Sequence, residues 1–289
     1  MQQRGASVDR ATQAWVRGTG RRVVVAEHPW LLGPVGATSV IGEEWLAAEA
    51  LRTGGELREG GGLLSDVNGL ASDEFDPAQI APEIVDFYQS TSEWRLDLWS
   101  QWSVWAWPFG WILSAVFARR LRQLSLPLRP LDVARGMDSR VVSVVDAKGR
   151  RLGAAWLRTL RATGQTVYSG WYGIVALPST RSPSIRVVFP LPIGSLTVFL
   201  RPANAGGGRL RLTSPLGRFG EEGAYLLVSA PDRTHAWVRR VPLVESFDVY
   251  VDEEGVLRTD HHGPWGNFGA PISLQTRAVD PVRGRTKWC

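Results

Sequence analysis

The chain has little cysteine, lysine or histidine. Its one cysteine, Cys289, is the last residue, which excludes an internal disulfide and a metal site built on cysteines. This usage is typical of a reducing compartment, and the first ten residues lack the apolar core of a secretory signal, so we expect a cytoplasmic protein. Lys148 and Lys287 are the only lysines, so arginine supplies 31 of the 33 basic side chains.

Several motifs are also missing. The glycines at 54–55 and 60–62 match neither GxGxxG nor a P-loop, and no serine stands in a Gly-x-Ser-x-Gly context. The longest aromatic stretch without charge, 103–118, has 16 residues and is interrupted at Pro108-Phe-Gly110. A membrane-spanning helix needs about 20 apolar residues. We therefore predict no bound cofactor and no simple transmembrane span.

The overall composition is that of a globular protein. Of the 289 residues 44% are hydrophobic and 21% charged, and the net charge is +5. The basic surplus lies in residues 126–289, whereas residues 1–125 carry more acidic than basic side chains. A basic surface favours anionic partners such as a lipid surface. The arginines are scattered at strand-like spacing and no nucleic-acid-binding module is recognisable, so no nucleic-acid partner is expected. The oligomeric state stays open.

The most unusual stretch is 94–111, which holds six of the 14 tryptophans. Asp76, Pro77 and Gln79 have the pattern of a helix start with a capping box. Apolar positions then follow at steps of three and four: Ile80, Ile84, Phe87, Thr91, Trp94, Leu98, Trp102 and Trp105. This spacing predicts one long helix that ends near Pro108, followed by a second helix over 111–124.

From residue 139 onwards the apolar period changes to two. The strands expected from this period are 140–146, 151–160, 166–176, 184–190, 195–201, 209–214, 224–230, 235–241, 246–252 and 256–261. We predict an α+β fold in which an N-terminal helical hairpin packs on a C-terminal antiparallel β-barrel or sandwich of calycin-like form.

The expected organisation has four segments. An irregular N-terminal segment, 1–75, begins with a loose stretch over 1–22 and includes a short strand near Arg21 and a short helix from Glu43 to Leu51. The Trp-rich helical hairpin covers 76–130, the antiparallel β domain 131–262, and an irregular tail 263–289.

Three interpretations of the aromatic stretch stay open: a buried core element, the wall of a ligand pocket, or a shallow dip into one membrane leaflet. The second interpretation is the one that leads to a function, because clustered rings suit a flat or polyisoprenoid molecule. The ligand-binding candidates are Trp94, Trp102, Trp105, Trp107, Trp111, Tyr168 and Trp171.

Candidate catalytic groups gather near the end of the β region. Asp260, His261 and His262 form the one place where a carboxylate and imidazoles adjoin, and Tyr250 and Asp248 share one face of their strand. These five residues are the candidates for acid–base chemistry. A metal would need further ligands from neighbouring strands, and no metal site is predicted.

Three runs of sequence carry a resemblance. They are Asp86-Phe-Tyr-Gln-Ser-Thr-Ser-Glu-Trp-Arg-Leu-Asp-Leu-Trp-Ser-Gln-Trp102, Leu126-Pro-Leu-Arg-Pro-Leu-Asp-Val-Ala-Arg-Gly-Met137 and Gly255-Val-Leu-Arg-Thr-Asp-His261. Together they resemble a family of uncharacterised bacterial proteins over residues 75–262. The resemblance implies no activity, cofactor or catalytic residue.

The leading hypothesis is binding of a hydrophobic small molecule, such as a lipid, isoprenoid or polyketide, between the barrel and the Trp-rich hairpin. One alternative is a cofactor-independent enzyme, a cyclase, isomerase or hydratase, acting on such a substrate. Another alternative is an accessory protein that lies on an anionic membrane surface.

Overall fold

The computed structural model describes residues 3–36, 42–100, 137–161, 164, 166–262 and 272–278, with backbone alone for 3–9, 95–100, 167, 261–262 and 272–278. Its α-helices are α1 (Gln3–Thr19), α2 (Glu44–Thr53) and α3 (Pro82–Gln89). Short 3-10 turns occupy Val25–Glu27, Pro29–Leu31, Val67–Leu70, Pro77–Gln79 and Thr91–Glu93.

The rest of the described chain is dominated by strands. They are β1 (Arg21–Val24), β2 (Glu56–Glu59), β3 (Trp94–Ser100), β4 (Met137–Val145), β5 (Arg151–Leu160), β6 (Thr166–Ala176), β7 (Pro183–Leu191), β8 (Gly194–Asn204), β9 (Leu210–Ser214), β10 (Gly223–Ser229), β11 (His235–Val241), β12 (Glu245–Val251), β13 (Leu257–His262) and β14 (Ile272–Ala278).

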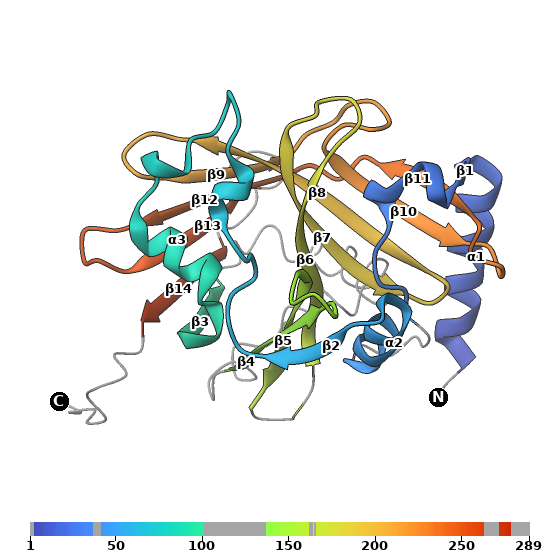
Figure 1. The fold of residues 1–289 in the computed structure, drawn as a ribbon, viewed down its shortest axis with the longest axis horizontal. Helices are drawn as coiled ribbons and strands as arrows, with labels where there is room; N and C mark the ends of the chain where they lie inside the picture. Colours follow the sequence, from blue (N-terminus) through green and yellow to red (C-terminus); the bar gives the residue numbers. More distant parts are fainter. Residues whose placement is uncertain are drawn as a thin grey trace.

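These strands form one 14-stranded sheet that branches at β8 (Figure 1). The main path runs β2-β4-β5-β6-β7-β8-β9-β12-β13-β14-β3, and β10, β11 and β1 leave it from β8. β8 is long enough for both branches, since residues 194–199 pair with β10 and residues 201–204 pair with β9. The ten strands expected between residues 139 and 262 are all present, which confirms the antiparallel β-rich fold.

The described strands form an open sheet whose path ends at β2 and β3. The closed, calycin-like barrel therefore stays a prediction. All four expected segments of the chain contribute strands to this one sheet, including β2 from the first segment and β14 from the last.

The sheet is covered differently on its two faces. We call the face of β4–β8 that carries Trp156 and Val187 the inner face; it packs against the segment from Leu63 to Trp94, which includes α3. The other face is called the outer face, and α2 covers it through Trp45, Leu46 and Ala50. A third apolar cluster surrounds Tyr225 beside β11. Figure 1 shows α1 and α3 at opposite ends of the sheet.

The prediction of one long helix from Asp76 is wrong. Asp76 does cap, since its Oδ1 accepts the Ala78 N–H at 3.0 Å, but the turn it starts is only Pro77–Gln79. Pro82 favours an extended conformation at the residue before it, so α3 begins afresh at Pro82. α3 ends at Gln89, and Trp94 starts strand β3. The second helix, over 111–124, lies outside the described residues.

Two other expectations need correction, and one is confirmed. Residues 1–22 are not all loose, because α1 covers Gln3–Thr19 and β1 begins at Arg21. The tail is not all irregular, because β14 pairs with both β13 and β3. The short helix expected from Glu43 to Leu51 is confirmed as α2, which ends where Gly54 adopts a left-handed conformation with φ of 65°.

Candidate functional site

The inner face is mostly apolar but carries a charged side chain, Arg158, on β5. Trp156 and Arg158 are two residues apart and therefore lie on the same side of the strand, whereas Leu157 between them belongs to the outer cluster. Across the strand pairs, Arg158 faces Ser139 of β4 and Tyr168 of β6. The sheet register thus places a charged side chain among the aromatic side chains of the inner face.

Arg158 is buried, with 6% of its surface exposed. Its guanidinium lies 5.2 Å from the centre of the Trp156 ring. Its Nε and Nη2 atoms are buried and have no hydrogen-bond partner, and no carboxylate of the described residues forms an ion pair with it. Such atoms are unusual, because burial removes hydration that no hydrogen-bond acceptor of the described residues replaces.

Tyr168 and Tyr172 lie near this guanidinium, and Tyr88 lies near these two tyrosines. The hydroxyls of Tyr168 and Tyr172 form a hydrogen bond with each other, and burial raises the pKa of both residues. Burial also raises the pKa of Tyr88, and the neighbouring Tyr172 adds to that shift. Edge-to-face contacts join Trp156 to both Tyr168 and Tyr172, at 5.4 and 5.9 Å. The tyrosines are therefore neutral hydroxyl groups near physiological pH.

Burial lowers the pKa of Arg158 to about 10, an effect that the nearby Tyr168 and Tyr172 partly oppose. The guanidinium still carries its positive charge at pH 7. Arg186, on β7, provides a comparison, because burial also lowers its pKa to about 10. Arg186 nevertheless donates to the Leu32 carbonyl and is stabilised by the charge of Glu49, whereas no carbonyl acceptor and no carboxylate of the described residues supports Arg158.

Buried carboxylates in the described part of the chain have partners. Glu49, 5% exposed, accepts two hydrogen bonds from Arg52, at 2.8 and 2.6 Å. Glu222 is fully buried and accepts from Arg201 at 2.7 Å. Arg158 differs from these carboxylates, because two of its buried nitrogens have no hydrogen-bond partner among the described residues, whereas Arg151 and Arg186 each have one such nitrogen.

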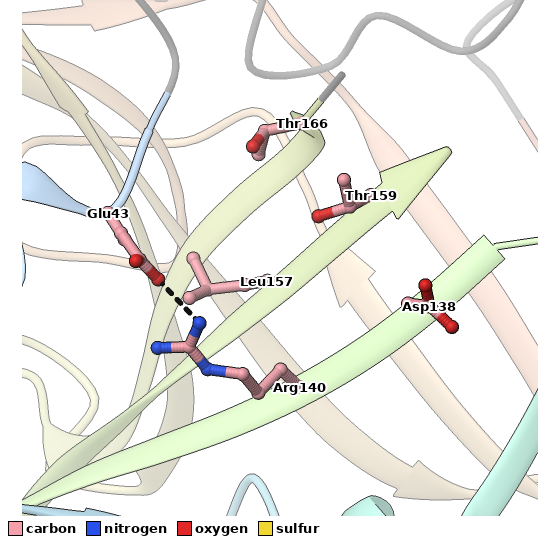
Figure 2. Close-up of a pocket in the computed structure, with 6 residues that line it drawn as sticks. All are labelled: Glu43, Asp138, Arg140, Leu157, Thr159 and Thr166. Carbon is pink, nitrogen blue, oxygen red and sulfur yellow. Dashed lines mark ion pairs between the residues drawn. The ribbon is translucent and has the colours of Figure 1, made fainter. Parts of the chain in front are cut away.

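A separate cavity of about 260 Å³ lies on the outer face, at the ends of β4, β5 and β6 (Figure 2). Its lining residues are Glu43, Asp138, Arg140, Leu157, Thr159 and Thr166. The charged groups there neutralise one another, since Arg140 pairs with Glu43 at 2.8 Å and Asp138 pairs with Arg161 at 2.7 Å. This cavity therefore offers two threonine hydroxyls and no unpaired charge.

The ligand-binding candidates expected from the sequence are placed apart. Tyr168 is on the inner face, whereas Trp171 is on the outer face, where its ring meets Trp45 at 6.0 Å. Trp94 is buried at the edge of the inner cluster and donates its indole N–H to Asp86 at 3.0 Å. The remaining four candidates, Trp102, Trp105, Trp107 and Trp111, lie outside the described residues.

The catalytic candidates lie on a different part of the sheet. Tyr250 donates to Asp260 at 3.0 Å, and Asp248 stands directly across the β12–β13 pair from Asp260. These side chains lie opposite the buried Val249, away from the inner cluster. Asp248 is bound by Arg211 through two hydrogen bonds, at 2.6 and 2.9 Å.

The structure describes the backbone of His261 and His262. His261 and His262 pair in register with Phe247 and Ser246, and their side chains lie outside the description. In the described part of the chain no group of three or more His, Cys, Asp or Glu is arranged to hold a metal ion. None of its helices has the length and apolarity to cross a membrane.

Arg158 was not among the residues selected from the sequence. A signal was present, since a charge interrupts the apolar run of the predicted strand 151–160 beside Trp156. What the sequence did not provide was the register, which sets Arg158 opposite Tyr168.

Comparison with known proteins gives one informative match. Over 225 residues the chain is 32% identical to the uncharacterized membrane protein YndJ of Bacillus subtilis (strain 168). The match covers 77% of this chain but 38% of that protein, so the chain spans well under half the length of the relative. No protein-family model and no solved structure matches. The resemblance to uncharacterised bacterial proteins is thereby confirmed.

Proposed function

We propose that this protein binds a hydrophobic small molecule against the inner face of its sheet. The observation that carries the proposal is the group of buried polar atoms set into an otherwise apolar surface: the Arg158 guanidinium and the hydroxyls of Tyr168 and Tyr172. Ligand sites of this kind combine an apolar wall with a few convergent polar groups.

The apolar wall is provided by neighbouring strands. Val187 and Phe189 of β7 and Leu196 and Val198 of β8 belong to the same cluster as Trp156. Partly buried apolar side chains, including Tyr168, Leu191 and Leu226, pack against it and provide a rim. A purely structural core would gain nothing from an unpaired guanidinium at this position, because an apolar side chain of similar volume is more favourable there.

The direct test is extraction of the purified full chain with organic solvent, together with native mass spectrometry. We expect a hydrophobic molecule to be released, or a neutral dye such as Nile red to bind to the empty protein. Tyr172→Phe, which removes a hydroxyl from the inner face, should alter dye affinity. The matched control is Tyr225→Phe, which removes a hydroxyl from the separate cluster beside β11. A protein that neither releases nor binds any apolar molecule contradicts the proposal.

A second candidate function, attachment to an anionic membrane surface, is favoured by the surface of α1 and β11. Arg239 lies over Trp15 at 5.4 Å, and Arg17 lies over Trp237 at 5.5 Å. Trp15 is 44% exposed, and Arg22 on β1 is exposed beside Trp237. Tryptophan and arginine together suit the boundary between lipid head groups and acyl chains. The related protein YndJ is named a membrane protein.

Vesicle flotation tests this second candidate. We expect the full chain to float with vesicles of phosphatidylcholine and phosphatidylglycerol but not with phosphatidylcholine alone, and high salt should release it. Trp15→Ser combined with Arg17→Ser should abolish flotation. Arg150→Ser removes an exposed arginine elsewhere and is the matched control. Equal flotation of the double variant and the control would contradict attachment through this surface.

A further inference from the structure

We propose that the inner face selects an amphiphile with an anionic head group, a carboxylate or a phosphate monoester, and that Arg158 binds the head group. The inference rests on the proposed function and adds the chemical class of the ligand. Three observations support it. The Nε and Nη2 edge of Arg158 has no acceptor among the described residues, the neighbouring tyrosine hydroxyls are donors, and the same edge binds carboxylates at Arg52 and Arg211.

The two nitrogens without a partner, Nε and Nη2, form one edge of the planar guanidinium. Their N–H bonds point the same way, which matches the two oxygens of a carboxylate or phosphate. Arg52 uses its Nε and Nη2 to bind both oxygens of Glu49. Arg211 uses its Nε and Nη2 in the same way with Asp248. The edge that carboxylates occupy at Arg52 and Arg211 is the edge without an acceptor at Arg158.

Among the described residues, the groups around Arg158 supply donors and no negatively charged acceptor. Tyr168 and Tyr172 have one hydroxyl proton each, and their mutual hydrogen bond uses only one of these two protons. The other proton is available to a ligand oxygen. The Trp156 indole N–H is already donated to the Ser139 hydroxyl at 2.8 Å. A guanidinium edge and one tyrosine hydroxyl therefore form a set of donors suited to a single anionic head.

The burial of Arg158 determines how strongly the site prefers an anionic head group to a neutral one. Charge-assisted hydrogen bonds inside a protein are roughly twice as strong as neutral ones, and an anion would restore the interactions that Arg158 loses on burial. A neutral head group, such as an alcohol, can accept one hydrogen bond but cannot offset the charge. Preference for the acid over the alcohol of equal chain length is the expected signature.

The experiment compares four probes by isothermal titration calorimetry on the delipidated full chain: palmitate, hexadecyl phosphate, hexadecanol and inorganic phosphate. We expect both acidic amphiphiles to bind about 10- to 100-fold more tightly than hexadecanol, the range for one or two charged hydrogen bonds. Inorganic phosphate, which has no chain, should bind far more weakly than hexadecyl phosphate.

Two variants and one control complete the test. Arg158→Met should lower the affinity for both acids to that for hexadecanol and leave hexadecanol binding unchanged, and Arg158→Lys should recover only part of the loss. Arg140→Met removes a positive charge from the outer face of the adjacent strand and should change none of the four affinities. Circular dichroism and thermal unfolding verify that each variant folds.

The outcomes separate the two proposals. The head-group inference is contradicted if hexadecanol binds as tightly as palmitate, or if Arg158→Met retains the preference for acids. Either result leaves the proposed binding of a hydrophobic molecule unaffected. If inorganic phosphate binds as tightly as hexadecyl phosphate, and Arg158→Met binds it more weakly, an anion site at Arg158 is supported and the proposed hydrophobic ligand is contradicted. If no probe binds, both fall.

Discussion

The two faces of β5 and β6 are buried to a similar depth but differ in how their polar groups are satisfied. On the outer face, the Trp45 indole N–H has two acceptors, the Gly42 carbonyl at 3.1 Å and the Ser169 hydroxyl at 2.9 Å. On the inner face, the Trp156 indole N–H has one acceptor, Ser139, and two guanidinium nitrogens of Arg158 have none. The Trp45 indole on the outer face is therefore fully satisfied, whereas the inner face retains donors at Arg158 that a ligand can use.

The largest expected effect tests whether the outer face is a packed core. Trp171 is 2% exposed and packs edge-on against Trp45. Trp171→Ala should lower the free energy of unfolding by about 3–5 kcal/mol, measured by urea denaturation. Leu216→Ala, at a position that is 65% exposed, is the control and should change it by less than about 0.5 kcal/mol. A loss below about 1 kcal/mol at Trp171 would show that this face is loosely packed.

The next effect is a pH dependence that belongs mainly to the inner face. Burial raises the pKa of Tyr88, Tyr168 and Tyr172, so the folded protein retains protons that the unfolded chain releases above about pH 10. Arg158 acts in the opposite direction, because its pKa is lowered to about 10. Arg186 acts in the same direction as Arg158, whereas the raised pKa values of Tyr225 and Tyr250 act in the direction of the three inner tyrosines. The tyrosines outnumber these two arginines, so stability should fall by roughly 1–3 kcal/mol per pH unit above about pH 10.

Absorbance at 295 nm measures tyrosine ionisation while circular dichroism measures folding. We expect the three inner-face tyrosines to ionise together with unfolding. Tyr168→Phe should reduce the steepness of the transition. Smooth ionisation of all tyrosines in a protein that stays folded would contradict the burial of this cluster.

A pair of arginine substitutions sharpens the contrast between paired and unpaired charge. Arg201→Met leaves the fully buried Glu222 without its ion pair and should lower the free energy of unfolding by about 3 kcal/mol. Arg158→Met removes a buried charge that has no partner and should leave stability unchanged or raise it by about 1–4 kcal/mol. Thermal denaturation of the two variants side by side distinguishes them, and a destabilised Arg158→Met would mean that the guanidinium has a structural role.

The smallest effect compares the two indole hydrogen bonds. Ser139→Ala leaves the Trp156 indole N–H without an acceptor and should lower the free energy of unfolding by about 1–3 kcal/mol. Ser169→Ala leaves the Trp45 indole N–H its second acceptor, the Gly42 carbonyl, and should lower it by about 0.5–1.5 kcal/mol. Urea denaturation gives both values, and a reversed order would contradict the difference between the faces.

Much of the β-sheet could be predicted from the sequence, because apolar and polar residues alternate wherever one side of a strand is more buried than the other. The strands expected at 151–160, 166–176 and 235–241 match the observed bounds of β5, β6 and β11. The pairing order could not be predicted. β8 pairs with β10 through its first half and with β9 through its second half. This change of partner depends on contacts between strands far apart in the chain.

The error in the Trp-rich region has a physical cause. The run Trp94-Arg-Leu-Asp-Leu-Trp-Ser100 alternates apolar and polar residues through most of its length, so it fits a strand as well as a helix. Just after α3, the Thr91 hydroxyl donates to the Phe87 carbonyl at 2.5 Å and accepts the Leu63 N–H at 3.2 Å, which ties the chain to the segment at Leu63. Pairing with β14, more than 170 residues later, then favours the strand.

The candidate site was the least predictable part. Tyr168 was among the aromatic ligand-binding candidates, but its partner Arg158 looked like one of many arginines at strand-like spacing. Only the register between β5 and β6 shows that this arginine faces the buried side, and only the absence of a carboxylate around it in the described chain makes it a candidate for binding.

The pairing of β3 with β14 has a consequence for synthesis on the ribosome. The partner of residues 94–100, residues 272–278, is made more than 170 residues later. At about 5–20 residues per second, β3 waits roughly 10 to 40 seconds for β14. β1 likewise waits for β11, because Arg21 pairs with Val238. The nascent chain therefore exposes unpaired strands until these later residues have been made, a period in which a chaperone would protect it from aggregation.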